Sequence, residues 1–284
     1  MTLRPATDHD RDAVLALGVA EETAWFGEAE VTAKEVGEWI DEEGGVSRGV
    51  VAVDDRGQVR GFALPGRREA VYLADPARTD ALANELLPWL REQSAAVAVM
   101  TFAGDAARVR AFERHELRHR RSSFWMVRPD GAGPVPPAEF PAGVDVAPHR
   151  LGDSDEAVHR LIYVDAAWAT VPGHAERDLS AWLDKDRSCT SMFLARRGDR
   201  PVGWVAARLL ASGRGYISTL AVATSERGRG LGRALLLQAF SDLQLAGARG
   251  FALAVEAEND SALRVYHSVG LEVEREWRIY ATPL

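Results

Sequence analysis

The sequence predicts a mixed α/β fold in which one structural module occurs twice. Three observations lead to this prediction: a proline-rich break near the middle of the chain, the same order of strand and helix patterns on both sides of it, and a close match between segments near the end of each half. At 284 residues the chain has the length of two domains of roughly 150 residues each. We therefore expect domains at residues 1–128 and 142–284, joined by a linker at 129–141.

The linker is identified by its composition. Residues 129–141 contain five prolines and two glycines in 13 positions. Proline has no backbone N–H and a fixed φ, so it interrupts both helices and the hydrogen-bonded ladders of central strands. We expect a stiff, extended connector without helix or strand.

Both halves show the same early elements. Each opens with a similar short segment, an acidic stretch and a helix pattern, and then shows two strand patterns separated by a tight turn. The turn sequences Asp54-Asp-Arg-Gly57 and Arg196-Arg-Gly-Asp199 have the residues that hairpin turns favour. The paired strand patterns lie at residues 50–53 and 59–63 and at residues 192–195 and 202–206.

The closest match between the halves lies near their ends. Residues 97–101 and 251–255 read as strands, and each is followed by a short helix that begins after Asp105 or Asn259. Asp and Asn are favoured N-cap residues because their side chains accept hydrogen bonds from the first turn of a helix. The offset is 154 residues at two marker positions (259 − 105 and 266 − 112). Three matches in the same order indicate a duplicated module.

The strongest chemical signal is a glycine-rich turn in the second half. A strand pattern at 216–222 leads to the turn Arg227-Gly-Arg-Gly-Leu-Gly232 and then to a helix pattern at 233–240. Glycines lack Cβ, so several backbone N–H groups can converge on an anion, and the start of a helix adds unpaired donors and the positive end of its dipole. Arg227, Arg229 and Arg233 add positive charge. The turn is expected to bind a phosphate or pyrophosphate, although it has neither the lysine of a Walker loop nor, at position 233, the last glycine of a dinucleotide motif.

Two motifs of the second half resemble the GNAT superfamily of acyl-CoA-dependent N-acyltransferases. One is Arg-x-x-Gly-x-Gly in residues 227–232, and the other is Asn-x-x-Ala-x-x-x-Tyr-x-x-x-Gly-Leu in residues 259–271, where the family has phenylalanine in place of Leu271. The resemblance covers roughly residues 190–284. It implies an α/β (α+β) fold of two tandem GNAT-like modules, each a mixed, mostly antiparallel twisted sheet flanked by helices, similar to the arrangement in mycothiol synthases.

The resemblance also implies an activity and a cosubstrate. Family members transfer an acyl group, acetyl by default, from acetyl-CoA to a primary amine by direct attack in a ternary complex. The turn would hold the pyrophosphate of CoA, the strand before it would run along the pantetheine arm, and no metal is expected. The cofactor-binding residues implied in this way are Leu220, Ala221, Val222, Arg227, Gly228, Arg229, Gly230, Leu231, Gly232, Arg233, Asn259 and Tyr266.

Catalytic and acceptor-binding residues follow from the same comparison. Tyr266 is expected to protonate the leaving thiolate, because a phenol can act as a general acid. Glu256, directly after the strand pattern at 251–255, is either the base that deprotonates the amine or a solvated carboxylate at a strand end. The expected acceptor-binding residues are Trp168, His174, Tyr216 and Ser218. The first two also have ordinary interpretations, as a core aromatic and as a surface histidine, and the last two could hold a water that relays the proton.

The first half lacks this chemistry. No glycine occurs in residues 77–87, which follow its corresponding strand pattern, and Asp75 and Asp80 would repel a pyrophosphate. Phe112, which cannot donate a proton, stands at the place of Tyr266. We therefore expect residues 1–128 to be a degenerate module that does not bind acyl-CoA.

Two other functions remain open on the sequence. A non-catalytic acyl-CoA sensor would need the same glycine-rich turn. His115-Glu116-Leu-Arg-His119 matches the zinc-hydrolase pattern His-Glu-x-x-His, which requires both histidines on one face of a continuous helix. The repeat places residues 117–126 opposite a strand pattern at 271–280, so we expect this motif to cross a helix end.

Composition narrows the partners and the location. A net charge of −8 disfavours binding to a nucleic-acid backbone, and a single cysteine, Cys189, cannot form an internal disulfide. The first dozen residues contain no apolar run, and the longest apolar stretch, at 95–100, is far shorter than the roughly 20 residues of a membrane span. We expect a cytoplasmic monomer or homodimer with a small-molecule amine acceptor and neither membrane nor nucleic acid as partner.

Overall fold

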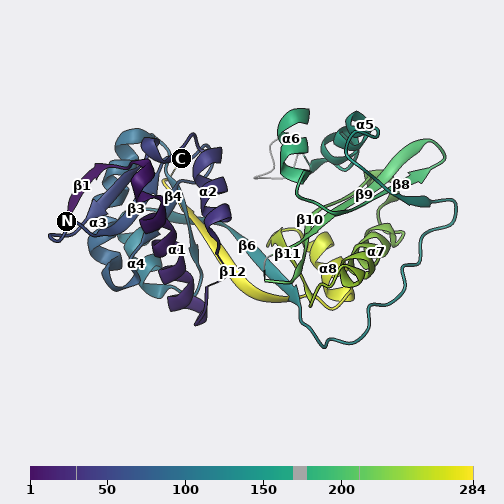
Figure 1. Ribbon diagram of the computed structural model, residues 1–284. Helices are drawn as coiled ribbons and strands as arrows, with labels where there is room; N and C mark the ends of the chain where they lie inside the picture. Colours follow the sequence, from purple (N-terminus) through teal and green to yellow (C-terminus); the bar gives the residue numbers. More distant parts are fainter. Residues whose placement is uncertain (30, 169–177, 211, 284) are drawn as a thin grey trace. The chain divides into compact units, whose positions relative to one another are not determined.

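The chain forms two compact units (Figure 1). The computed structural model describes residues 1–29, 31–168, 178–210 and 212–283. Unit 1 consists of Met1–Ser123 and Arg275–Leu284, and unit 2 consists of Phe124–Glu274. Strands β6 (Arg118–Arg128) and β12 (Glu272–Ala281) therefore each carry residues of both units.

Unit 1 contains an antiparallel sheet in the order β1-β2-β3-β4. The fifth strand, β5, pairs antiparallel with residues Trp277–Ala281 of β12. The bounds are β1 (Thr2–Pro5), α1 (Arg11–Phe26), α2 (Ala33–Glu42), β2 (Val50–Val53), β3 (Val59–Leu64), β4 (Val71–Ala74), α3 (Thr79–Gln93), β5 (Ala98–Phe102) and α4 (Ala106–Arg114).

Alternation along the strands of unit 1 divides its apolar residues between two cores. Val50 and Ala52 of β2 pack in one core with residues of α3 and α4, whereas Val51 between them packs in the other core with residues of α1 and α2. Successive side chains of a strand point to opposite faces of the sheet. The run Val-Val-Ala-Val is apolar throughout because both faces of this strand are covered.

Unit 2 has the strand order β6-β11-β10-β9-β8-β7. Strands β7 to β10 pair antiparallel with one another, and β10 pairs parallel with β11. The bounds are β7 (Asp145–Pro148), α5 (Asp155–Arg160), a π-helical turn (Leu161–Asp165), α6 (Leu179–Asp186), β8 (Ser191–Arg197), β9 (Arg200–Leu209), β10 (Gly215–Val222), α7 (Leu231–Leu245), β11 (Phe251–Glu256) and α8 (Asp260–Ser268).

The sheet of unit 2 is also covered on both faces. Figure 1 shows α5 and α6 on one side of its strands and α7 and α8 on the other. Trp182 of α6 and Trp204 of β9 are fully buried on the α5–α6 face, while Leu235 and Phe240 of α7 are fully buried on the opposite face. Ligands that reach the sheet must therefore enter where strands separate or end.

The hairpins expected from the sequence are confirmed, since β2 pairs with β3 and β8 with β9 in antiparallel register. Residues 129–144 contain neither helix nor strand. Residues 275–284 differ from the expected division, in which they belonged to the second half. They lie in unit 1 because the second part of β12 pairs with β5.

A buried ion pair links two helices of unit 1. The guanidinium of Arg108 in α4 and the carboxylate of Glu21 in α1 lie 2.6 Å apart, and their side chains are only 1% and 3% exposed. Glu21 accepts a 2.5 Å hydrogen bond from the backbone N–H of Ala74, and Arg108 donates a 3.4 Å hydrogen bond to the carbonyl of the same residue. The rings of Trp25 and Tyr72 lie 5.1 and 5.5 Å from the Arg108 guanidinium carbon. The pair thus joins α1, α4 and the end of β4.

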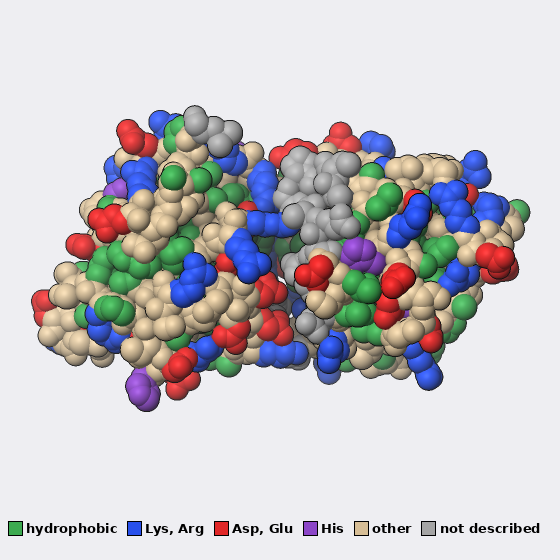
Figure 2. All heavy atoms as spheres, turned by 90° about the horizontal axis from the view of Figure 1, so that it is seen from above, with side chains coloured by type: hydrophobic (Ala, Val, Ile, Leu, Met, Phe, Trp, Pro, Cys, Tyr) green, Lys and Arg blue, Asp and Glu red, His purple; other side chains and the backbone are tan. Residues whose placement is uncertain are grey.

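The surface carries mixed charge. Figure 2 shows acidic and basic side chains interspersed on the face that it presents, in keeping with 42 acidic and 34 basic residues in the chain. Among the helices described, none combines the length and the apolar character required to cross a bilayer.

Arg108→Ala is expected to lower the free energy of unfolding by about 3–5 kcal/mol, because it leaves the Glu21 carboxylate as a buried charge without its partner. Urea denaturation followed by circular dichroism measures the change. Arg110→Ala is the matched control, because Arg110 is an exposed arginine on the same helix. Equal losses in the two variants would contradict the structural role of the buried pair.

Candidate functional site

The candidate site of unit 2 begins where β10 separates from β11. Among the described residues, the parallel register joins Gly215 to Phe251 and Tyr216 to Ala252 and then ends. A bulge follows at Ser218, since Ile217 pairs with Ala207 of β9 and Thr219 with Ala206. A bulge bends the strand that contains it. The β10 backbone from Thr219 to Val222 keeps its pairing with β9, so its other edge can present N–H and C=O groups to a ligand.

The glycine-rich turn lies at the end of β10 and leads into α7. Gly228 and Gly230 have φ values of 76° and 84°, a left-handed conformation that side chains with Cβ disfavour. Apart from the glycine itself and its chain neighbours, no atom of the described residues lies within 4 Å of a Cβ built on either glycine. Gly230 is the N-cap of α7, and no side chain caps this helix. The first N–H groups of α7 therefore lack intrahelical partners and can bind an anion.

The arginines of the turn differ in their contacts. The Arg227 guanidinium donates a 2.7 Å hydrogen bond to the carbonyl of Ala166, and Arg229 lies 3.5 Å from the carboxylate of Glu226. Arg233 is half-buried and has no hydrogen bond or ion pair to any side chain or backbone group that the structure describes. Positive charge thus gathers around the start of α7.

A buried carboxylate that the sequence analysis missed holds this turn in place. Glu226 is 7% exposed and accepts hydrogen bonds of 3.0 and 2.9 Å from the guanidinium of Arg197 in β8. This pairing holds the pKa of Glu226 below its ordinary value. The contact connects the turn to a strand far away in the sequence, and no local pattern marks it.

The expected motif of α8 places Tyr266 and Asn259 beside the separated strands. Tyr266 is 8% exposed, and burial, together with the nearby Tyr216 phenol, raises its pKa above the ordinary value, so it stays protonated. Asn259 is the N-cap of α8, and its Oδ1 accepts a 3.1 Å hydrogen bond from the N–H of Ala262. Only its amide NH2 group is then left for a ligand. Glu256 is the last residue of β11 and is half-buried.

Tyr216 and Ser218 have neighbours that the sequence analysis did not identify. The Tyr216 ring stacks on Trp125 of β6 with 5.4 Å between centroids, and the guanidinium carbon of Arg208 in β9 lies 5.7 Å from its centroid. The thiol of Cys189 lies 3.5 Å from the Ser218 hydroxyl, to which it can donate. Arg208 pairs directly with Tyr216 across β9 and β10, just before the bulge at Ser218 shifts the register of the two strands.

The other two expected acceptor-binding residues are Trp168 and His174. Trp168 is half-buried and packs against the core of the α5–α6 face, as its alternative interpretation had it. His174 lies outside the described residues.

In unit 1 the corresponding strands also separate. Strand β4 meets β5 only through a bridge between Ala70 and Val99, as far as the described residues show. The Glu21–Arg108 pair then takes up both the N–H and the C=O of Ala74, at the end of β4. Arg108 stands 154 residues before Ala262, at the same offset as the helix markers. Unit 2 thus has the methyl group of Ala262 at the position where unit 1 has the guanidinium of Arg108.

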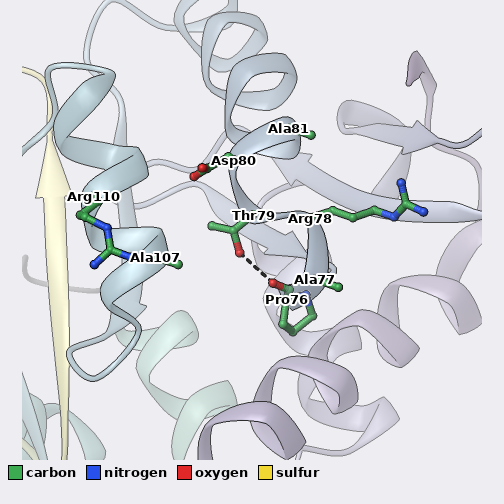
Figure 3. A pocket seen from close by; sticks show the side chains of 8 residues that line it. All are labelled: Pro76, Ala77, Arg78, Thr79, Asp80, Ala81, Ala107 and Arg110. Atoms are coloured by element: carbon green, nitrogen blue, oxygen red, sulfur yellow. Dashed lines mark hydrogen bonds between the residues drawn. The ribbon is translucent and has the colours of Figure 1, made fainter.

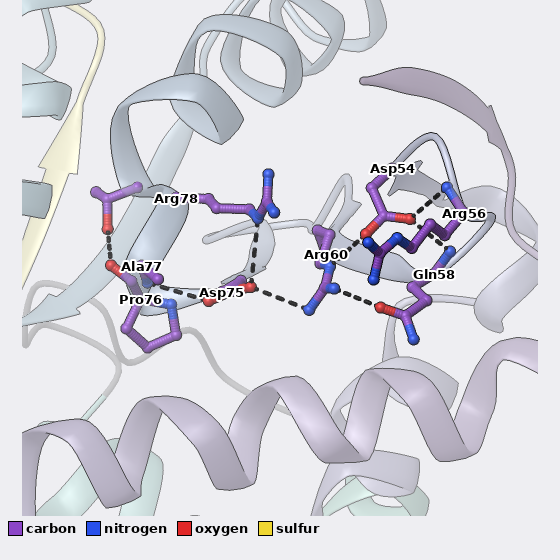
Figure 4. Close-up of polar contacts among 9 residues, drawn as sticks. Asp54, Arg56, Gln58, Arg60, Asp75, Pro76, Ala77 and Arg78 are labelled. Carbon is purple, nitrogen blue, oxygen red and sulfur yellow. Dashed lines mark hydrogen bonds and ion pairs between the residues drawn. The ribbon is translucent and has the colours of Figure 1, made fainter.

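A cavity of about 430 Å³ lies at the start of α3 in unit 1 (Figure 3). Its lining includes residues 76–81 and Arg110. Figure 3 shows the Arg78 side chain extending away from Arg110, so the two charges do not converge. Figure 4 shows why: Arg78 pairs with Asp75 at 3.7 Å, and Asp75 also accepts a hydrogen bond from Arg60. Arg78, which directly precedes α3, is thus already paired with an acidic residue of unit 1.

The His-Glu-x-x-His motif crosses the end of α4, as expected. His115 is the C-cap residue, Glu116 has a φ of 60°, and β6 begins at Arg118. The two histidines consequently contact different partners, Asn84 at 2.9 Å and Ser122 at 3.1 Å. The single-helix geometry that a zinc hydrolase needs is not formed, so this alternative is wrong. Within the described ranges no group of three or more His, Cys, Asp or Glu side chains could hold a metal ion.

Comparisons with known proteins agree with this architecture. The sequence profile of the acetyltransferase (GNAT) family matches residues 158–271. A mycothiol acetyltransferase from Thermobispora bispora is 30% identical over 164 residues, which are 53% of this chain and 54% of that protein. The chain thus matches about half the length of this relative.

Solved structures share the fold over nearly the whole chain. A GCN5-related N-acetyltransferase from Sphaerobacter thermophilus superposes with a TM-score of 0.79 at 23% identity, covering 99% of this chain and 95% of the other. A tandem GNAT protein from the clavulanic acid biosynthesis pathway gives a TM-score of 0.74 at 15% identity, covering 99% and 98%. Residues 158–271 thus match the acetyltransferase (GNAT) family, and the chain as a whole shares the fold of these two solved structures.

Proposed function

We propose that unit 2 transfers the acetyl group of acetyl-CoA to a primary amine of a small molecule, by direct attack in a ternary complex. The observation that carries this proposal is the separation of β10 from β11. An unpaired backbone edge follows the separation, an anion-binding turn lies at its end, and a protonated buried phenol lies beside it.

The residues around the separation suit acetyl-CoA, which supplies an activated thioester. The pyrophosphate would meet the N–H groups of the turn and of the first turn of α7, with Arg227, Arg229 and Arg233 adding charge. The absence of atoms near the Cβ positions of Gly228 and Gly230 leaves that approach clear. The backbone of Leu220–Val222 and the amide of Asn259 would hold the pantetheine arm.

The proposed chemistry needs proton movements before and after attack. The amine nitrogen bonds to the carbonyl carbon while the carbon–sulfur bond breaks, and the leaving thiolate takes a proton from the Tyr266 hydroxyl. The proton that the nitrogen of the new amide loses then restores the Tyr266 phenol. A backbone N–H of β10 donates to the carbonyl oxygen as negative charge develops on it. Before attack, the ammonium loses a proton either to Glu256 or to a water held by Tyr216 and Ser218.

We propose further that residues 1–128 do not bind acyl-CoA. The Glu21–Arg108 pair already uses the backbone groups of Ala74 that a pantetheine arm would need. Displacing it would leave two buried charges unpaired, which is costly.

The activity is tested by release of CoA thiol from acetyl-CoA in a screen across amine classes. Amine-dependent release at a rate that saturates with both substrates is expected, because both must be bound together. Binding of acetyl-CoA without release with any amine would contradict the proposal and favour a non-catalytic acyl-CoA sensor.

Gly230→Ala is expected to weaken acetyl-CoA binding roughly tenfold, about 1.4 kcal/mol, because the added strain distorts the backbone donors of the turn. Isothermal titration calorimetry measures the dissociation constant. Gly213→Ala is the matched control, since Gly213 has a φ of 82° and the same free surroundings in the β9–β10 connection. If both variants bind acetyl-CoA equally, the turn does not hold the cosubstrate.

Tyr266→Phe is expected to lower kcat about 100-fold or more while acetyl-CoA still binds, because the proton donor is lost. Since burial raises the pKa of Tyr266 above the ordinary value of about 10, wild-type kcat should show no loss from this group as the pH rises to 10. The measurement is kcat between pH 7 and about 10, and Tyr280→Phe, a buried tyrosine of unit 1, is the control. Full turnover by Tyr266→Phe would contradict the proposed role of Tyr266 as proton donor.

A further inference from the structure

We propose that the amine acceptor also carries a carboxylate and that Arg208 binds this group. The inference rests on the function proposed above and names the class of acceptor that this site takes. It is carried by a positive charge beside the strand separation that has no carboxylate partner among the described residues.

Arg208 lies next to the place where the reaction is proposed to occur. It pairs with Tyr216 across β9 and β10, and Tyr216 is the last residue of β10 in register with β11. The guanidinium carbon lies 5.7 Å from the centroid of the Tyr216 ring. The Tyr216 phenol is in turn close enough to Tyr266 to raise the pKa of that residue. The Tyr216 side chain therefore lies near both the Arg208 guanidinium and the proposed proton donor.

The partners of Arg208 leave its charge uncompensated. One terminal nitrogen donates a 2.9 Å hydrogen bond to the hydroxyl of Ser188, while Nε is buried and finds no hydrogen-bond acceptor among the described atoms. None of the described carboxylates lies within ion-pair distance of Arg208. Two other arginines of unit 2 do have such partners: Arg197 pairs with Glu226 and Arg214 with Glu274. A partly buried charge without an opposite charge is unfavourable, and a ligand anion would relieve this.

A second hydrogen-bond donor without an acceptor among the described residues belongs to the side chain that stacks on the Tyr216 ring. The indole of Trp125 stacks on Tyr216, and its buried Nε1–H has no acceptor within the part of the chain that the structure describes. A buried indole N–H normally finds a hydrogen-bond partner. These two donors, together with the rings of Trp125 and Tyr216, therefore suit a small group that accepts hydrogen bonds and has an apolar stem.

The single positive charge of Arg208 favours a carboxylate over a phosphate as the bound group. A guanidinium offers a planar fork of donors that matches a carboxylate, and one guanidinium balances a single negative charge. A phosphate of charge close to −2 would remain only half balanced. The chain gathers three arginines at the turn before α7, where the pyrophosphate is proposed to bind, whereas among the described residues one arginine lies over the Tyr216 ring.

The experiment compares amines that differ only in the carboxylate. L-amino acids and ω-amino acids are each paired with the corresponding amide and the decarboxylated amine. Thiol release from acetyl-CoA gives kcat and KM, and isothermal titration calorimetry in the presence of CoA gives binding without chemistry. The variants are Arg208→Gln, Arg208→Lys and, as the matched control, Arg249→Gln, which changes an exposed arginine of unit 2.

We expect the wild type to favour at least one carboxylate-bearing amine over its amide by tenfold or more in kcat/KM. Arg208→Gln should abolish this preference through KM, Arg208→Lys should retain part of it because the charge remains, and Arg249→Gln should retain all of it. The KM for acetyl-CoA should stay the same in all variants. A role in stacking on Tyr216 alone would not distinguish an acid from its amide.

The outcomes separate this inference from the proposed function. Turnover of amines without a preference for the carboxylate, or an undiminished preference in Arg208→Gln, overturns the inference and leaves the acetyltransferase activity standing. Carboxylate-dependent binding that Arg208→Gln abolishes, but without thiol release, supports the inference and overturns the activity. Binding of no carboxylate-bearing amine in the calorimeter overturns the inference directly.

Discussion

The separation of β10 from β11 is the constraint on which the arrangement of unit 2 depends. The two parallel strands stay in register for two residue pairs, and the bulge at Ser218 then bends β10 away. Backbone N–H and C=O groups that do not pair with a neighbouring strand need other hydrogen-bond partners. The free edge of β10 therefore needs such partners. The turn and α7 follow β10 in the chain, and α8 with Tyr266 follows β11. One local departure from pairing therefore brings backbone donors, an anion-binding turn and a phenol to the same place.

In unit 1, side chains of the unit itself supply hydrogen-bond partners for the corresponding strand edge. Its β4 also leaves β5 early, but the N–H and C=O of Ala74 are taken by Glu21 and Arg108. The buried pair makes this end of the strand part of the structural core, whereas the small Ala262 in unit 2 keeps the corresponding position free of charge. Duplication thus yields two modules of the same architecture, of which one has its binding edge closed from within.

Arginine serves several purposes in this chain, and the partner decides which. Arg108 is neutralised in a core, Arg197 positions the glycine-rich turn through Glu226, and Arg78 is matched by Asp75. Arg208, unlike these three arginines, has no such carboxylate among the residues described. A buried charge is unfavourable unless an opposite charge lies close to it. The presence or absence of a carboxylate partner therefore indicates whether an arginine stabilises the fold or can bind an anionic ligand.

The sequence by itself determined the features that depend on neighbours along the chain. Turn residues between two apolar strand patterns predicted the hairpins, the helix-capping residues Asp105 and Asn259 marked the repeat, and glycines and arginines in one short stretch marked the turn before α7. Only the tertiary structure decided that the end of β12 pairs with β5 and that Trp125 stacks on Tyr216. It alone also showed that Arg108, and not a ligand, meets Ala74. The physical reason is that packing, desolvation and ion pairing depend on distances between residues far apart in sequence, and no local pattern encodes those distances.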